Sequence, residues 1–160
     1  MLPRGTAVWR LDDSVLRDFD AIVALHLRAA LGAVALRVPA LEARDVVGRP
    51  IVEVVRGLIS QFRRRPAESA EVARVEADFS ARMAEHLRVG VGVRETPGAT
   101  ASLIALRESR IHVSLRSQLS QTVVDAAVRR LRWEDLLGEV VVDDRAAESA
   151  KAIPEPSKRA

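Results

Sequence analysis

The stretch 14–38 reads SVLRDFDAIVALHLRAALGAVALRV and carries almost no polar side chains in its second half. Between residues 21 and 36 the only polar side chains are His26 and Arg28. The acidic and hydroxyl side chains just before it can accept hydrogen bonds from the first turn of a helix, and Pro39 would stop one. The pattern therefore predicts a central helix about 36 Å long, apolar around most of its circumference.

This central helix is predicted to be buried in the protein and not in a membrane. Its apolar run is shorter than the ~20 residues needed to cross a bilayer, and Arg28 interrupts it. Other elements must therefore pack around it. We expect no membrane-spanning segment.

The chain is long enough to form one domain with a real hydrophobic core. It has 160 residues, of which 48% are hydrophobic. We expect a single globular domain over residues 1–142 and a disordered tail over 143–160, where the sequence is polar and carries Pro154 and Pro156. The absence of cysteine excludes disulfides and thiolate sites. The amino-terminal residues lack the apolar core of a signal peptide, so we expect a cytoplasmic protein.

The basic character of the chain comes from arginine. Only Lys151 and Lys158 are lysines, so 23 of the 25 basic residues (25 minus 2) are arginines. The formal net charge is only +3, and the high calculated isoelectric point reflects the high pKa of arginine acting on a nearly balanced chain. Overall charge is therefore weak support for a nucleic-acid partner.

Two helices are predicted in the middle of the chain. Pro50 is well placed as the first residue of a helix that runs to about residue 64. Residues 67–88 show the clearest amphipathic pattern, with apolar side chains at three- and four-residue steps. These apolar positions are Val72, Val75, Phe79, Met83 and Leu87.

A short strand is expected over residues 5–11. The stretch 10–20 that follows resembles the opening of ribbon-helix-helix repressors, in which a strand precedes a helix. That family continues with a turn and a second helix capped by Ser or Thr. In this chain the first helix is expected to continue to Val38, which departs from the family pattern.

The period of the apolar pattern changes after residue 88. Residues 88–94 alternate strictly, Pro97-Gly98 suits a turn, and residues 100–107 and 110–116 read as two further strands. An antiparallel register brings their apolar side chains onto one face. A helix through 101–116 is the alternative.

The remaining elements complete an α+β fold. A helix is expected over residues 117–137 and a last strand over 139–142. The predicted architecture is a helical amino-terminal half packed around the central helix 14–38, followed by a small antiparallel sheet (88–116 and 139–142) and one helix. An all-α bundle is the alternative.

The antiparallel register also predicts a basic face. If the Val, Ile and Leu side chains cover one face of the sheet, the opposite face gathers arginines and a histidine that could bind an anion or a protein partner. These candidate binding residues are Arg88, Arg94, Arg107, Arg110, His112 and Arg116. The alternative is an inert, solvated sheet face.

No motif for catalysis, a metal or a cofactor is found in the sequence. The three histidines, His26, His86 and His112, are far apart along the chain and form no metal-binding pattern. His26 is expected to be a core or interface histidine with one hydrogen bond. The glycines of the stretch 89–93 lack the third glycine of a dinucleotide-binding loop and follow a predicted helix, where that loop follows a strand.

These observations favour a non-enzymatic role. The apolar first helix and the high apolar content predict a homo-oligomer or a subunit of a larger complex, acting as an assembly, adaptor or structural protein through protein–protein contacts. The alternative is an anion- or nucleic-acid-binding regulatory protein that uses the arginine-rich sheet face. Nucleic acid is not favoured, because no aromatic side chain interleaves the arginines. No catalytic residue and no cofactor are predicted.

Overall fold

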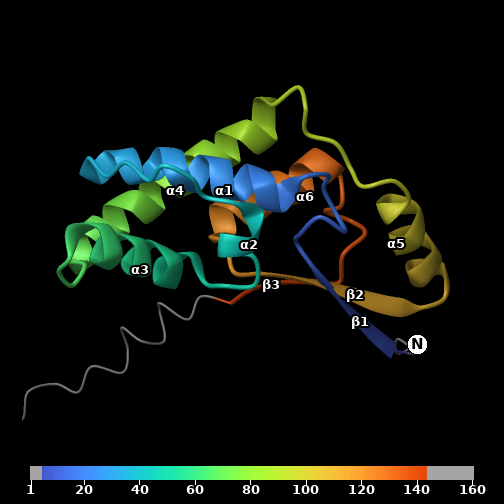
Figure 1. Ribbon diagram of the computed structural model, residues 1–160. Helices are drawn as coiled ribbons and strands as arrows, with labels where there is room; N and C mark the ends of the chain where they lie inside the picture. Colours follow the sequence, from blue (N-terminus) through green and yellow to red (C-terminus); the bar gives the residue numbers. More distant parts are fainter. Residues whose placement is uncertain (1–4, 144–160) are drawn as a thin grey trace, which may run out of the picture.

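The computed structural model describes residues 5–143 and consists of helices stacked over a small sheet (Figure 1). In chain order the elements are β1 (Gly5–Arg10), α1 (Phe19–Ala30), the 3₁₀ helix η1 (Leu31–Val34), α2 (Ala43–Val46), α3 (Ile51–Arg63), α4 (Ser69–Val89), α5 (Ala99–Glu108), β2 (Ile111–Ser117), α6 (Gln121–Leu131) and β3 (Glu139–Val142). Within this part of the chain, no helix is long and apolar enough to cross a membrane. The tail predicted for residues 143–160 lies almost entirely outside the described residues.

The sheet is parallel, with the strand order β1-β2-β3. Gly5 pairs with Ile111 and Arg10 with Arg116, while Ser114 begins the pairing of β2 with β3. The predictions of an antiparallel sheet and of an all-α bundle are both wrong. The fold is of the α/β class, because both connections between paired strands cross over through helices.

The helices lie on one side of the sheet (Figure 1). Trp9 of β1 meets Trp133 edge to face, with ring centroids 5.8 Å apart, and Trp133 is fully buried. Val8 precedes Trp9 in β1, so its side chain points the other way, and it is 53% exposed. The sheet therefore has one face buried against helices and one face largely open in the described chain.

The segment 88–108 is helix and loop where strands were predicted. The helix α4 continues to Val89, and α5 spans Ala99–Glu108, so the helical alternative for 101–116 is correct up to residue 108 and wrong for 111–116, which form β2. The alternating valines do not share one buried face, because Val89 and Val91 are 53% and 94% exposed whereas Val93 is buried in the core. Gly90 is needed for the tight exit from α4, since a Cβ there would lie 2.4 Å from the carbonyl oxygen of His86.

The central helix is shorter than predicted. The residues expected to form its first turn instead make a loop, in which the carboxylate of Asp12 accepts hydrogen bonds from the backbone N–H (2.9 Å) and hydroxyl (2.6 Å) of Ser14. Asp18 adopts a left-handed conformation with φ 55°, and α1 starts only after it. At the other end, Ala35 is also left-handed and closes η1. Local hydrogen bonds from Asp and Ser thus compete with the helix.

The other helices lie close to their predicted positions. The buried residues of α4 are Val72, Val75, Phe79, Met83 and Leu87, the same five that the sequence pattern selected. The helix α3 occupies residues 51–63, and α6 lies within the predicted range 117–137. Strong helical periodicity was therefore a reliable signal in this chain.

Trp133 joins the sheet to α5. Its indole Nε1 donates a 2.8 Å hydrogen bond to the Thr100 hydroxyl, and its ring packs on Trp9. We predict that Trp133→Ala lowers the free energy of unfolding by about 3–5 kcal/mol, measured by urea denaturation, because it leaves a large cavity. Val91→Ala at the exposed loop should change it by less than about 0.5 kcal/mol. Equal effects of the two substitutions would contradict this account of the core.

His26 of α1 lies against His86 of α4, with ring centroids 4.8 Å apart. Its buried Nε2 has no hydrogen-bond partner in the described chain, where the sequence predicted a satisfied one. Burial, then His86 and Arg82, hold the pKa of His26 below its ordinary value of 6.5. The unfolded chain therefore binds this proton more readily than the folded one.

We predict that stability is highest above pH 6.5, the ordinary pKa of His26, and falls as the pH drops from there toward the lower pKa of the folded state. Thermal unfolding scans of the wild type and of His26→Leu across this range measure the effect. The variant should lose part of the pH dependence. An identical pH profile for both proteins would show that His26 does not titrate on unfolding.

Candidate active site

A pocket of about 470 Å³ opens at the carboxyl ends of all three strands. It is lined by the end of β1 with the loop after it, by the end of β2 with the loop after it, and by Asp143 directly after β3. The start of α1 and the connection between α2 and α3 close its other side. We call this the carboxyl-end pocket. In open α/β sheets, this edge is where ligands bind.

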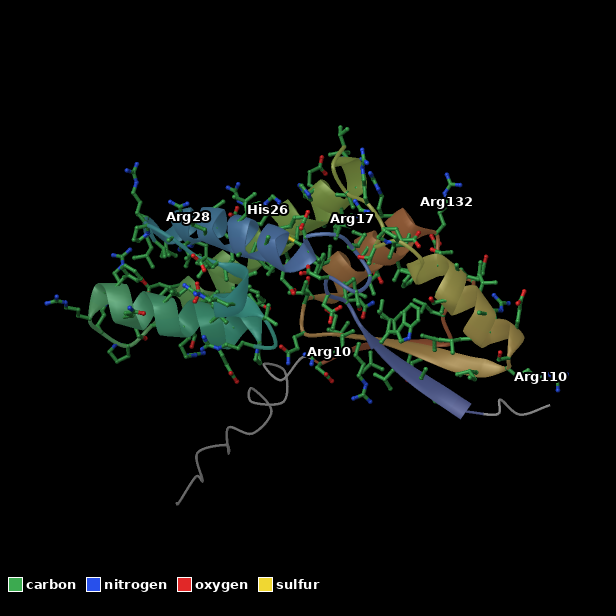
Figure 2. All side chains as sticks on the ribbon, turned by 45° about the vertical axis from the view of Figure 1, so that its right-hand side comes forward. Arg10, Arg17, His26, Arg28, Arg110 and Arg132 are labelled. Atoms are coloured by element: carbon green, nitrogen blue, oxygen red, sulfur yellow. The ribbon has the colours of Figure 1, made fainter. Side chains whose placement is uncertain are left out.

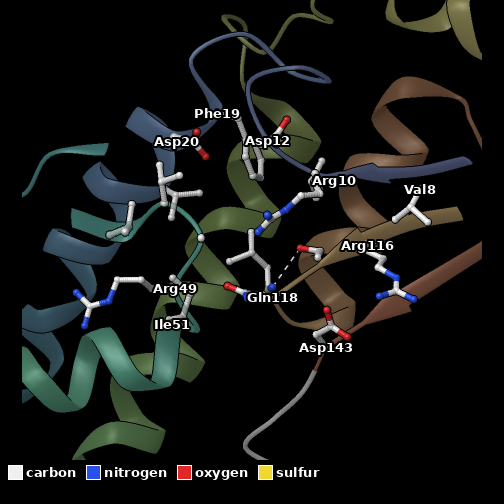
Figure 3. A pocket seen from close by; sticks show the side chains of 17 residues that line it. Val8, Arg10, Asp12, Phe19, Asp20, Arg49, Ile51, Arg116, Gln118 and Asp143 are labelled. Carbon is white, nitrogen blue, oxygen red and sulfur yellow. Dashed lines mark hydrogen bonds between the residues drawn. The ribbon is translucent and has the colours of Figure 1, made fainter. Parts of the chain in front are cut away.

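Arg10 is the cation at the centre of the carboxyl-end pocket. It is the last residue of β1, and it is exposed. Figure 3 shows its side chain reaching into the pocket on the side where Asp12 and Asp20 lie. No hydrogen bond or ion pair joins its guanidinium group to another residue within 5–143, so the group is available to a ligand.

Asp12 and Asp20 line the same pocket as Arg10, from two different elements. Asp12 belongs to the loop after β1, and Asp20 belongs to the first turn of α1. The backbone N–H of Asp20 donates a 2.9 Å hydrogen bond to the Asp13 carboxylate. Burial raises the pKa of Asp20 above its ordinary value of 3.8, and repulsion from Asp13 and Asp12 adds to this, while Arg10 opposes it. An acid whose pKa is raised beside a cation and other carboxylates is typical of catalytic sites.

The loop after β2 forms the floor of the pocket. Ser117 is buried, and its hydroxyl accepts a 3.1 Å hydrogen bond from the Leu119 backbone N–H. Its carbonyl oxygen accepts another, of 2.8 Å, from the Asp143 backbone N–H. These bonds fix the turn that carries Gln118, whose side chain lies below Arg10 in the view of Figure 3.

The wall opposite the sheet is apolar. It is formed by side chains of α1 and of the connection between α2 and α3, with Gly48 at φ 70° turning the chain there. Arg49 adds only its stem, because its guanidinium group donates to the Asp45 carbonyl oxygen and points away from Arg10 (Figure 3). The apolar residues of this wall are Phe19, Val23, Val46, Val47 and Ile51. A ligand can therefore place a charged group near the sheet and an apolar body here.

The described residues bring no metal-binding cluster together. Within 5–143 there is no group of three or more His, Asp or Glu side chains that could hold a metal ion. One oxygen of Asp12 is already engaged by Ser14. The charges of the carboxyl-end pocket are therefore those of its own side chains.

The six residues predicted for the basic face do not share one face. Arg88 ends α4 and pairs with Glu85 at 2.9 Å. Arg94 lies in the loop before α5, where its carbonyl oxygen accepts a hydrogen bond from the backbone of Arg17. Arg107 of α5 donates to the carbonyl oxygen of Asp135.

The other three predicted residues lie on or next to β2. Arg110 precedes the strand in a left-handed conformation and lies far from Arg10 (Figure 2). The His112 ring packs against Gly138, where a Cβ would come within 1.9 Å of it. Arg116 lines the carboxyl-end pocket, and it alone of the six does so.

Sequence reasoning missed Arg10, Asp12 and Asp20. The stretch was interpreted as a helix cap, because acidic residues before an apolar run are typical of one. A signal was present, since Arg10 and Asp12 directly follow an expected strand. Polar residues at the end of a strand become a site only if the sheet is parallel, and that was not predicted.

No protein-family model matches this chain, and no curated protein matches it by sequence. Solved structures do match it. A predicted phosphoglycolate phosphatase from Haemophilus somnus 129pt superposes with a TM-score of 0.67 and 14% identity, over 87% of this chain and 62% of its own. A HAD hydrolase, family IA, variant 3 from Entamoeba histolytica gives a TM-score of 0.69 and 11% identity, over 88% and 61%.

A third similar structure, a HAD family hydrolase from Deinococcus radiodurans R1 with bound phosphate and sodium, has a TM-score of 0.50 and 18% identity, over 92% of this chain and 61% of its own. This chain thus spans about three fifths of the length of these structures. At such identities the likeness establishes the fold, which is the HAD-like α/β fold with a parallel sheet.

These neighbours correct the functional prediction. A non-enzymatic assembly, adaptor or structural protein was expected, with a regulatory protein using an arginine-rich sheet face as the alternative. The chain instead shares its fold with solved structures named as a predicted phosphatase and as a hydrolase, and the sheet of the described residues is parallel, so the antiparallel sheet that carried the arginine face is not formed there. The arginine-face alternative failed with that sheet, whereas the assembly role had been inferred from the apolar first helix and the high apolar content of the chain.

We predict that Asp20→Asn raises the thermal unfolding temperature at pH 7, because the raised pKa means that the ionised carboxylate is unfavourable in the folded state. This cost is absent below the ordinary pKa of 3.8, where the carboxyl is protonated in both states. The gain should therefore shrink on acidification. Glu134→Gln on the exposed surface is the control. A destabilised Asp20→Asn variant at neutral pH would contradict the electrostatics described.

Proposed function

We propose that this chain is a hydrolase that cleaves a small phosphomonoester in the carboxyl-end pocket. The observation that carries the proposal is the grouping of Arg10, Asp12 and Asp20 at the end of β1. A guanidinium group matches the oxygens of a phosphoryl group, and a carboxyl with a raised pKa can deliver a proton to a leaving alcohol.

The similar structures support the same chemical class. Of the three described above, one is named as a predicted phosphatase and two as hydrolases, and one of these hydrolases holds phosphate. The pocket's size of about 470 Å³ suits a small molecule. Its charged floor and apolar wall suit a phosphoryl group joined to a compact organic body.

The residues present suffice for acid–base hydrolysis. With the phosphoryl oxygens on Arg10, a water oxygen attacks phosphorus while its proton passes to the Asp12 carboxylate. The ester P–O bond breaks, and the leaving oxygen takes the proton of Asp20. The products are an alcohol and hydrogen phosphate, and proton exchange with solvent returns both carboxyls to their starting states. The reaction is accelerated in two ways: the pocket holds the phosphoryl group and the water in position, and the two carboxyl groups accept and donate the protons.

Two further predictions from the sequence stay predictions. The first is a cytoplasmic location. The second is a homo-oligomer or a complex with other subunits, which Val8 and Leu25 support, because they are 53% and 60% exposed and offer apolar surface.

Activity toward phosphomonoesters tests the proposal. We predict that the purified chain releases inorganic phosphate from p-nitrophenyl phosphate or from a member of a panel of small phosphomonoesters. Asp20→Asn should lower kcat by about 10²–10⁴-fold with a smaller change in KM, because it removes the general acid and leaves the phosphoryl-binding cation in place.

Arg56→Gln, on the exposed face of α3, is the matched control and should keep wild-type kinetics. Asp20→Asn that folds and retains full kcat would exclude the acid role of Asp20. Phosphate release that persists equally in every variant would indicate a contaminating phosphatase, and release from no member of the panel would overturn the proposed function.

A further inference from the structure

The phosphoryl group of a phosphomonoester carries up to two negative charges, and a site that binds it must balance them. Proteins do this with a divalent cation held by carboxylates, or with arginine side chains and backbone N–H groups. The two solutions leave different residues at the site. A cation site gathers oxygen ligands, whereas an arginine site presents unpaired guanidinium groups.

The carboxyl-end pocket lacks the features of a cation site. No metal-binding cluster of His, Asp or Glu exists within residues 5–143. Asp12 uses its Oδ1 atom to hold the loop after β1 through Ser14. A divalent cation placed near Asp12 and Asp20 would also meet the permanent positive charge of Arg10, which acts on Asp20 electrostatically.

The pocket has the features of an arginine site. Arg10 and Arg116 are partners in the parallel register, so two guanidinium-bearing residues stand side by side at the ends of β1 and β2. Both are exposed, and neither guanidinium group has a hydrogen-bond or ion-pair partner within the described chain. Figure 3 shows Arg10 directed into the pocket and Arg116 at its rim near the end of β3.

We propose that Arg10 takes the place of a divalent cation, so that this pocket binds the phosphoryl group without a metal ion. The inference rests on the proposed function, because it concerns the same pocket and the same ligand. Arg116 raises the positive potential at the neighbouring strand end. A guanidinium group is a permanent cation with a planar set of donors that fits phosphoryl oxygens, so binding through Arg10 needs no metal ion.

Titration calorimetry with inorganic phosphate tests the proposal on the wild-type chain. One arm contains EDTA, and the other contains magnesium chloride. We expect the same affinity in both arms, and an affinity about ten- to hundredfold weaker for Arg10→Gln in EDTA, because charge-assisted hydrogen bonds are lost. Arg10→Lys should fall between the two, since it keeps the charge and loses the planar fork. Arg56→Gln should bind as the wild type does.

The outcomes separate this inference from the proposed function. Phosphate binding that appears only with magnesium would overturn the metal-free site and leave a phosphoryl-binding pocket standing. Equal binding by folded Arg10→Gln and wild type in EDTA would also overturn it, since another group would then balance the charge. No phosphate binding in either arm would remove both proposals. The comparison of the two wild-type arms holds even if Arg10→Gln fails to fold.

Discussion

The parallel pairing of β1 with β2 is the constraint on which the rest of this structure depends. Strands that run in the same direction cannot be joined by a tight turn, so the chain must return from the end of β1 to the start of β2. The helices α1 to α5 make that return, and α6 makes the next one. The same pairing brings the carboxyl ends of the strands to one edge, where the loops after them form a pocket.

The strand order explains why charged residues can end these strands with little desolvation penalty. With the order β1-β2-β3, two crossovers of the usual right-handed sense place their helices on the same side of the sheet. Trp9 and Leu115 point toward those helices and are covered by them, whereas Arg10 and Arg116 end their strands as exposed residues at the carboxyl-end pocket. A guanidinium group that is exposed at the end of a strand keeps its hydration, and no charge has to be buried to hold it there.

Elements with a strong local pattern were predictable, and pairings between distant segments were not. The five buried residues of α4 follow from spacing alone, and β3 lies where its valines predict a strand. The valines of 89–93 alternate as in a strand, yet Val91 projects into solvent. Alternation predicts a strand only where one face of the strand is buried, and no other strand pairs with this stretch in the described chain. The strand at 111–117 was recognised, but its true partner is Gly5–Arg10, more than a hundred residues earlier, and a register built from neighbours in sequence could not find it.

The candidate site could not be predicted from the sequence, because it depends on the same pairing between distant strands. Some of its residues also make local hydrogen bonds. Asp12 holds the loop through Ser14 and also faces the pocket, and Asp13 caps α1 while raising the pKa of Asp20. Local chemistry explains each of these residues fully, so nothing in the sequence calls for a second role. Arg10 is different, because no neighbour in the described chain satisfies it. A strand that ends in a guanidinium group without a hydrogen-bond partner, beside a partner strand that ends in another, offers both groups to a ligand at this edge.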